Sequence, residues 1–490
     1  MPDQDNFKEG LKGTALFGSV GILNIVISIV KSKIVAVLLG PTGMGVLGLF
    51  NSSVDLINKS SNFSLRTSAI KDISGAYASQ DEIKLSKTYS IFKKLIILTG
   101  LLGLLICCVC SPYLSLSSFG SYQYTASFII LAISLPVLQF SDGLNVLMQS
   151  TRHLKLLAKS NVLGHILSLL LVIPIYYLFG ISGIVYTIIL GYIVHFGITW
   201  FFAKEIKIDL VKVTISQAIK EGKGMLKLGL MISLQGIFVA LSGYIIRAYI
   251  SQTASVEEVG LYTAGFFIIN TYTGIVFSGM ATEYYPRLAS MSEDNHKVFK
   301  AVESQGELSI MLIAPLVTTF ILFGDIAILF LYSKEFQGIS MMINISMLGI
   351  FFKAPSWCLG YVFLSKGDSK VFFWNELVYI LYTLVLNILF YKFWGLTGMG
   401  LSFLISFFIY WIQNIIVCHY RYQYIFNISL LKILLPQLIF STLCFLCSLN
   451  SDMLQRYLIG CIFVFASILF SYRLLRKNVD IGVLMKKFKR

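Results

Sequence analysis

Charge is scarce in this sequence. Only 13% of its 490 residues are Asp, Glu, Lys or Arg, and the 24 acidic residues are outnumbered by 39 basic ones. Soluble domains have about a quarter of their residues charged, so the composition excludes a soluble globular protein. The N-terminus also lacks the basic segment and the small-residue cleavage site of a signal peptide, so we expect its first apolar run to stay in the protein.

Groups typical of catalysis or metal binding are missing as well. Cys107, Cys108 and Cys110 have no His or Cys partners at zinc-ligand spacing, so we interpret them as small apolar residues. We find no nucleophile with its base and no Gly loop that could hold a phosphate. The sequence therefore predicts a protein that is not an enzyme and that has no metal and no cofactor.

Long apolar runs are abundant, since 56% of the residues are hydrophobic. The runs repeatedly reach the length of about 17 to 25 residues that crosses a bilayer as a helix. The sequence thus predicts an all-α polytopic membrane protein with about 14 transmembrane helices. The predicted spans are 13–39, 42–62, 95–110, 128–149, 163–178, 181–203, 228–250, 260–282, 308–332, 341–364, 371–390, 396–420, 430–447 and 458–472.

Basic residues gather in every second gap between the runs. With a cytoplasmic N-terminus, the gaps and tails on the cytoplasmic side hold 31 Lys and Arg, and the opposite side holds only Lys334, Lys392 and Arg456. Basic loops are retained inside, so we predict that both termini are cytoplasmic. These charges also attract anionic membrane lipids, and we do not expect binding to nucleic acid.

Several residues recur 215 positions later, which indicates an internal duplication. The pairs are Gly45 and Gly260, Lys155 and Lys370, Tyr176 and Tyr391, Gly180 and Gly395, and Gly183 and Gly398. This offset spans six predicted helices, an even number, so both copies have the same orientation, as in transporters with parallel repeats. We predict a six-helix bundle at 1–205, a cytoplasmic linker at 206–225, a second bundle at 226–420, and two further helices with a basic tail at 421–490.

Three stretches carry a family resemblance: SKIVAVLLGPTGMGVLGLF at 32–50, SVEEVGLYTAG at 255–265, and the segment 331–378. Along most of helices 1 to 12, the chain resembles polysaccharide-lipid flippases of the O-antigen translocase type, closest to the lipid III flippases, in the multidrug/oligosaccharidyl-lipid/polysaccharide exporter superfamily. The resemblance implies two bundles in a V shape in the bacterial inner membrane. It also implies movement of an undecaprenyl-diphosphate-linked oligosaccharide from the inner to the outer leaflet.

The resemblance further implies which residues meet the substrate. In the family, basic residues of helix 1 and of its repeat mate line the cavity and contact the phosphates, and Lys31, Lys33 and Arg247 occupy those places here. Lys353 and Glu376 fall where the lipid III flippase-like sequences carry Lys and Glu.

The residues themselves point to some of the same positions. A Lys or Arg at the centre of a spanning helix costs about 2.5 to 3.5 kcal/mol, so it needs a cavity, a partner or an interface. Lys353 lies too deep in its span for easy snorkelling, so we predict a cavity role, with an ion pair to Asp142 or Asp55 as the alternative. Lys31, Lys33 and Arg247 either share that cavity or snorkel to the outer interface.

Further polar residues leave two interpretations open. Asp55 and Lys59 lie four apart on one helix face, either as a structural pair or as part of the cavity. Arg66, at the cytoplasmic mouth, either meets an incoming diphosphate or only fixes the topology. The pair Glu283 and Arg287 is interpreted as structural. His165 and His195 are interpreted as core histidines rather than proton carriers.

These features favour an anionic cargo, because the cations in the spans outnumber the acids. The leading hypothesis is a flippase for a lipid-linked glycan, with a proton or sodium ion and the polysaccharide polymerase machinery as further candidate partners. A multidrug antiporter of the same superfamily is the first alternative, although it should have an acidic cavity. A membrane glycosyl polymerase or ligase is the second, although the outward loops are too short for its active site.

Overall fold

A computed structural model describes the backbone of residues 2–450 and 452–478 and, within these ranges, every side chain except those of residues 2–19, 22, 282, 477 and 478. All regular elements in this part of the chain are helical. The chain divides into two compact units, Met1–Thr263 (unit 1) and Ala264–Arg490 (unit 2).

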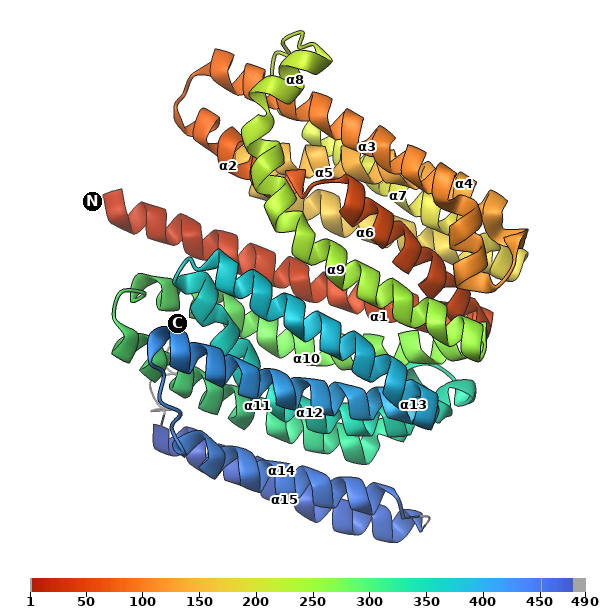
Figure 1. Cartoon of the computed structure of the whole chain (residues 1–490), viewed down its shortest axis with the longest axis vertical. Coiled ribbons are helices and arrows are strands. Elements are labelled where there is room, and N and C mark those ends of the chain that lie inside the picture. Colours follow the sequence, from red (N-terminus) through yellow and green to blue (C-terminus); the bar gives the residue numbers. More distant parts are fainter. Residues whose placement is uncertain (1, 451, 479–490) are drawn as a thin grey trace. The chain divides into compact units, whose positions relative to one another are not determined.

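The helices follow one another with short connections (Figure 1). Unit 1 contains α1 (Pro2–Ser61), α2 (Leu65–Ala78), α3 (Glu82–Phe119), α4 (Thr125–Ala132), α5 (Ser134–Ser150), α6 (Leu154–Phe179), α7 (Gly183–Ala203), α8 (Ile215–Glu221) and α9 (Lys223–Thr253). Helix α10 (Val256–Ser290) starts in unit 1 and continues into unit 2. Unit 2 further contains α11 (Asn295–Leu331), α12 (Ser340–Ser365), α13 (Ser369–Tyr422), α14 (Ser429–Ser448) and α15 (Met453–Asn478).

Glycine residues with positive φ mark the breaks between predicted spans. Gly40 (φ 64°) interrupts α1, and Pro41, whose fixed φ suits the first turn of a helix, opens the second part. Gly180 (φ 54°) ends α6, and Gly395 (φ 56°) interrupts α13. Residues with a Cβ rarely adopt these conformations, so the sequence fixes the positions of the breaks.

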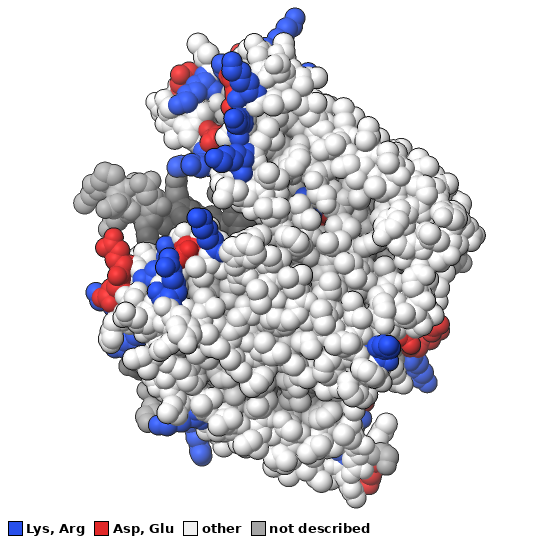
Figure 2. All heavy atoms as spheres, in the orientation of Figure 1, with Lys and Arg blue, Asp and Glu red and all other residues white. Residues whose placement is uncertain are grey.

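Eleven segments in the described part of the chain are long and apolar enough to cross a membrane. Three of them, 23–61, 154–203 and 369–422, each cover most or all of two predicted runs, which are separated at the three glycines. The predicted runs therefore lie on helices, while the number of separate spans remains a prediction. In the view of Figure 2, charged side chains gather toward helix ends and leave a broad uncharged expanse on each unit.

The duplication seen in the sequence has a structural counterpart. Gly180 (φ 54°, ψ −135°) and Gly395 (φ 56°, ψ −139°) have nearly the same backbone conformation. Three residues later, Gly183 and Gly398 pack on backbone carbonyls, because a Cβ would lie 3.0 Å from the Ile175 oxygen and 2.0 Å from the Phe390 oxygen respectively. Those carbonyls are also 215 positions apart, so both copies build the same hairpin.

The last two helices, which lie outside the repeat, attach to α11 through polar contacts. Gln437 of α14 hydrogen-bonds to Ser471 (2.8 Å) and Ser467 (2.6 Å) of α15, and the Thr318 hydroxyl of α11 lies 2.7 Å from that of Ser441. Hydrogen bonds between apolar helices stabilise association where burial of apolar surface contributes little.

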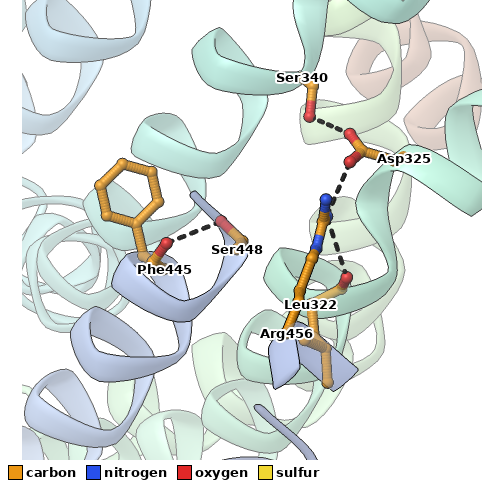
Figure 3. Close-up of polar contacts among 6 residues, drawn as sticks. All are labelled: Leu322, Asp325, Ser340, Phe445, Ser448 and Arg456. Atoms are coloured by element: carbon orange, nitrogen blue, oxygen red, sulfur yellow. Dashed lines mark hydrogen bonds and ion pairs between the residues drawn. The ribbon is translucent and has the colours of Figure 1, made fainter. Parts of the chain in front are cut away.

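An ion pair fixes the start of α15 (Figure 3). Arg456 Nη2 lies 2.7 Å from Asp325 Oδ2 of α11, and the Ser340 hydroxyl of α12 donates to the same carboxylate. Arg456 also donates to the Leu322 carbonyl at 3.4 Å. At the other end of the connection, Ser448 closes α14 by donating to the Phe445 carbonyl at 2.7 Å. This pair gives Arg456 a structural role.

The compact units do not follow the predicted domain boundaries residue by residue. Helix α9, placed in the second bundle at 226–420, lies within unit 1. The bundle assignment rests on the repeat and stays a prediction.

Candidate functional site

Five charged residues form a cluster inside unit 1, contributed by α1, α2, α5 and α9. Arg66 Nη1 of α2 lies 2.8 Å from Asp142 Oδ1 of α5. Asp142 is also attracted electrostatically to Lys59 of α1, and Asp55 to Lys59 and to Arg247 of α9. Lys59 thus interacts electrostatically with both acids. The cluster contains three cations and two anions and is net positive.

The turn before α2 positions Arg66. Phe63 (φ 48°) and Ser64 (φ 44°) both have left-handed backbones, and the Asn62 side chain accepts a hydrogen bond from Ser64 N at 2.9 Å. Helix α9 passes so close that a Cβ on Gly229 would lie 2.0 Å from the Phe63 carbonyl oxygen. The turn is therefore held between α1 and α9.

Arg247 has a guanidinium N–H donor without a hydrogen-bond partner among the described residues. Its Nη1 donates to the Gly243 carbonyl at 3.0 Å, and its guanidinium lies 5.4 Å from the centre of the Tyr262 ring. The donor without a partner is Nε, which is buried. A guanidinium has five N–H donors in a fork that matches phosphate oxygens, so Arg247 is suited to an anionic group.

Two histidines lie beside this cluster on α6 and α7. The rings of His165 and His195 are 5.3 Å apart, and His195 packs so closely on α6 that a Cβ on Gly164 would lie 2.7 Å from its ring. His195 interacts electrostatically with Arg66, and His165 with Lys31. His165 Nδ1 is also bonded to the Asn161 carbonyl at 2.8 Å, but its side chain is exposed, so the structure does not confirm it as a core histidine.

In unit 2, Lys353 lies among aromatic rings. Its Nζ is 5.8, 5.7 and 5.3 Å from the ring centres of Phe277, Phe403 and Phe407, and 3.5 Å from Asn270 Oδ1. Cation–π attraction of this kind stabilises an ammonium group out of water. The salt bridges found in the described part of unit 2 involve Arg287, Lys297, Arg421 and Arg456, and none involves Lys353.

A polar network lies next to this lysine. Asn375 of α13 donates to Asn414 at 2.8 Å, and Asn414 donates to the Ser356 carbonyl of α12 at 3.1 Å. The Tyr410 hydroxyl donates to Glu376. The Tyr410 ring contacts Phe407, which also contacts Lys353. The network joins α12 to both parts of α13 around the lysine.

A family model described as "Polysaccharide biosynthesis protein" matches residues 34–341, which is more than half of the chain. The chain belongs to this family. No curated protein matches the chain in sequence. This family and the many apolar helices of the chain agree with the resemblance to polysaccharide-lipid flippases seen in the sequence.

Solved structures show the same fold. The lipid II flippase MurJ in an inward closed conformation is similar with a TM-score of 0.71 and 15% identity, over 95% of this chain and 99% of the flippase. An inward-facing multidrug resistance MATE family transporter of the MOP superfamily is similar with a TM-score of 0.67 and 16% identity, over 83% and 95%. Together with the candidate spans, this fold shows that the protein is a multi-pass helical membrane protein, as the sequence predicts.

A third structure differs in its binding pocket. A MOP superfamily transporter from Pyrococcus furiosus, described by the reverse polarity of its binding pocket, has a TM-score of 0.54 and 16% identity, over 83% of this chain and 94% of its own. One fold thus accommodates pockets of different charge. The cargo of this family member therefore has to be inferred from its own residues.

The structure brings some predicted site residues together. Asp55, Lys59, Arg66, Asp142 and Arg247 form the unit 1 cluster. Lys353 and Glu376 lie in unit 2 on either side of the contact between Phe407 and Tyr410. Lys31 is exposed and Lys33 is half-buried on α1. No comparison tests the binding role of these residues, which stays a prediction.

Two structural interpretations can be compared directly with the structure. Glu283 Oε1 and Arg287 Nε form an ion pair at 3.2 Å, which confirms the predicted pair. Arg287 also donates to Gln305 at 3.0 Å. The other is the ion pair of Lys353 with Asp142 or Asp55, the alternative to a cavity role. Asp142 forms its ion pair with Arg66, 76 positions away in the chain.

Some residues near the site carried a weak signal in the sequence. Tyr410, Gln413 and Asn414 are polar residues within an apolar span, at the spacing of one helix turn. Polar residues in such spans face other helices rather than lipid, so their presence pointed to an internal network. The sequence did not indicate which helix they contact.

Proposed function

We propose that this protein is a flippase that moves a glycan linked to undecaprenyl diphosphate from the inner to the outer leaflet of the bacterial cytoplasmic membrane. Its family and its flippase- and transporter-like fold support this class. The orientation with both termini in the cytoplasm follows from the distribution of basic residues. In this proposal the protein performs no enzymatic step.

The observation that carries the proposal is the state of Arg247. Its Nε is buried without a partner within the described residues, although a buried N–H donor without a partner is costly. Asp55, an acid with which it interacts electrostatically, also interacts with Lys59, and the cluster as a whole is net positive. Such a group is completed by an anion with several oxygen acceptors, and the diphosphate of the lipid carrier is one.

Lys353 supplies a second cationic point in this proposal. It has aromatic neighbours and an amide oxygen in place of a carboxylate, so its charge is not neutralised by an ion pair in the described part of unit 2. Lys31 and Lys33 of α1 are further candidate cations in this proposal. We assign these cations to the diphosphate and to acidic sugars, while the lipid tail stays in the bilayer.

The membrane potential can drive such a cycle. A diphosphate diester carries about two negative charges, and an inside-negative potential favours their outward movement by about 2.3 kcal/mol per charge per 100 mV. The same field draws the empty cationic site inward. A proton or sodium ion as coupling ion, and the polymerase machinery as the receiver of the product, remain candidate partners.

The test is reconstitution of the protein in vesicles with a fluorescent undecaprenyl-diphosphate oligosaccharide. Arg247→Gln should slow the appearance of the glycan in the other leaflet by about 10- to 100-fold, because a hydrogen bond between charged groups is lost. Arg287→Gln, which removes an equal charge from a structural pair, is the matched control and should retain most activity.

Two results would contradict the proposal. If Arg247→Gln and the wild type move the glycan at equal rates, the cluster does not bind the diphosphate. If the wild type exports cationic drugs and leaves the lipid-linked glycan in place, the protein is a multidrug transporter. Flipping at full rate after the potential is abolished would reject the driving scheme alone.

A further inference from the structure

The connection between α7 and α9 contains apolar residues that pack on the protein and others that are exposed. This linker, residues 204–223, includes α8 and ends with the first residue of α9. Ile206, Ile208 and Val213 pack on the core of unit 1 together with the buried Ala218. Four other aliphatic side chains of the linker are exposed: Leu210 (51%), Val211 (47%), Ile215 (50%) and Ile219 (50%). Contiguous exposed aliphatic residues indicate a surface that meets an apolar partner.

Three contacts fix the linker to α3. The Val211 backbone N–H donates to the Ser90 hydroxyl at 3.0 Å, and Glu221 pairs with Lys87 at 2.8 Å. Gly222 packs so closely that a Cβ would lie 2.7 Å from Leu95 Cδ1. The Thr214 side chain and Gln217 form a reciprocal cap at the start of α8. The linker is therefore packed against α3 as an ordered part of unit 1.

These contacts also determine the depth of the linker. Lys84, Lys87, Lys93 and Lys94 precede the apolar run of α3, which begins at Leu95. Ser90 is five residues before Leu95, or about 7.5 Å along a helix at about 1.5 Å per residue. The linker thus contacts α3 where the chain passes from water into hydrocarbon, which is the depth of lipid headgroups. In Figure 1, α8 lies at the same end of unit 1 as α2.

The charges of the linker suit an anionic surface. Its five lysines, all exposed, outnumber its three acids, and one of these acids, Glu221, is already paired with Lys87. The lysines are Lys204, Lys207, Lys212, Lys220 and Lys223. Lys204 lies over the ring of Phe201 at 4.3 Å, beside the exposed Trp200. Aromatic residues next to lysines are typical of the membrane–water boundary.

We propose that the linker is an in-plane anchor that binds anionic phospholipids of the leaflet on the basic side, which the charge distribution makes the cytoplasmic one. Leu210, Val211, Ile215 and Ile219 enter the boundary between headgroups and acyl chains. The lysines contact the lipid phosphates. An amphipathic segment with aliphatic residues on one side and lysines around it binds such a surface by both effects.

The experiment compares the full-length protein in nanodiscs of phosphatidylcholine alone and of phosphatidylcholine mixed equally with phosphatidylglycerol. Amide hydrogen exchange in residues 204–222 should be about five- to tenfold slower in the anionic discs. The pair Lys212→Gln and Lys220→Gln should remove this difference. Lys297→Gln, which removes an exposed lysine of unit 2, is the control and should preserve it.

A second pair of variants tests the exposed aliphatic residues. Ile215→Gln with Ile219→Gln should speed exchange of the linker in both kinds of disc, while protection of α3 stays unchanged and reports an intact fold. Equal exchange of the wild type in both discs would overturn the proposal without any variant. So would protection that appears only in native membranes, because that result would assign the surface to a protein partner.

Discussion

Gly45 and Gly260 approach each other so closely that neither position has room for a side chain. A Cβ on Gly45 would lie 1.9 Å from the Val256 oxygen, and a Cβ on Gly260 would lie 1.8 Å from the Pro41 oxygen. The two glycines are 215 positions apart in the chain, and so are Pro41 and Val256. The contact between α1 and α10 is therefore reciprocal under the internal repeat.

Alanine at either glycine should separate α1 from the start of α10. We expect Gly45→Ala and Gly260→Ala each to lower stability by about 1 to 3 kcal/mol, because the backbones must move apart. Thermal unfolding of the purified protein in detergent measures this. Gly75→Ala in α2, where a Cβ meets nothing within 4 Å, is the control and should be neutral or slightly stabilising. Equal melting of all three variants would contradict the close contact.

Removing one partner of the pair between Arg456 and Asp325 should loosen α15. Arg456→Met leaves the Asp325 carboxylate, whose side chain is 32% exposed, without its 2.7 Å partner, and we expect a loss of about 3 kcal/mol. Adding Asp325→Leu should recover much of that stability. The exposed pair of Lys297 and Asp294 is the comparison, since Lys297→Met should cost less than about 1 kcal/mol. A double variant no more stable than Arg456→Met would show that the pair is not the cause.

Exchanging Arg66 and Asp142 distinguishes a structural pair from a binding residue. Arg66→Asp with Asp142→Arg keeps opposite charges at the 2.8 Å contact, so folding should recover relative to either single change. The half-exposed cation moves from α2 to α5, however, and we expect glycan transport to stay low. Purified yield and flipping in vesicles are the two measurements. Full recovery of transport would make Arg66 purely structural.

The start of α11 should depend on pH through Asp294. Its carboxylate accepts a hydrogen bond from Lys297 N at 3.1 Å, and this bond and the Lys297 side chain lower the pKa of Asp294. A lowered pKa in the folded state means that the stabilisation is present above about pH 4, the unfolded value, and is lost as the pH falls through the folded value.

Hydrogen exchange in the first turn of α11 measures this effect. Exchange, corrected for its intrinsic pH dependence, should become less protected as the pH falls below about 4. Asp294→Ala should give low protection at every pH, whereas Asp294→Ser, which can still accept the bond, should retain protection without the pH dependence. A pH dependence that survives in Asp294→Ser would assign the titration to another group.

The sequence predicts the parts of this structure that depend on spacing along one helix. The positions of the apolar runs, the breaks at Gly40, Gly180 and Gly395, and the pair of Glu283 and Arg287 follow from residues close in the chain. Such features are local, because helix geometry alone fixes which residues share a face.

Spacing along one helix does not predict which residues of different helices contact one another. The pairing of Arg456 with Asp325, and the three rings around Lys353, depend on how each helix is rotated about its axis. Nearly continuous apolar sequence leaves this rotation undetermined, since several faces of the helix are equally hydrophobic. The polar residues in the spans indicate which positions need a polar partner, but the partner itself is determined by helix packing.

Gly180 and Gly395 have nearly the same backbone conformation, so we expect that one hairpin can replace the other. Each hairpin carries its own glycine and its own backbone contact three residues later, so the turn geometry is encoded within each hairpin. A graft that replaces residues 175–187 by 390–402 should therefore give a chain that still folds. Under the proposed function, differences between the two halves in transport would then not arise from the corners that join these helices.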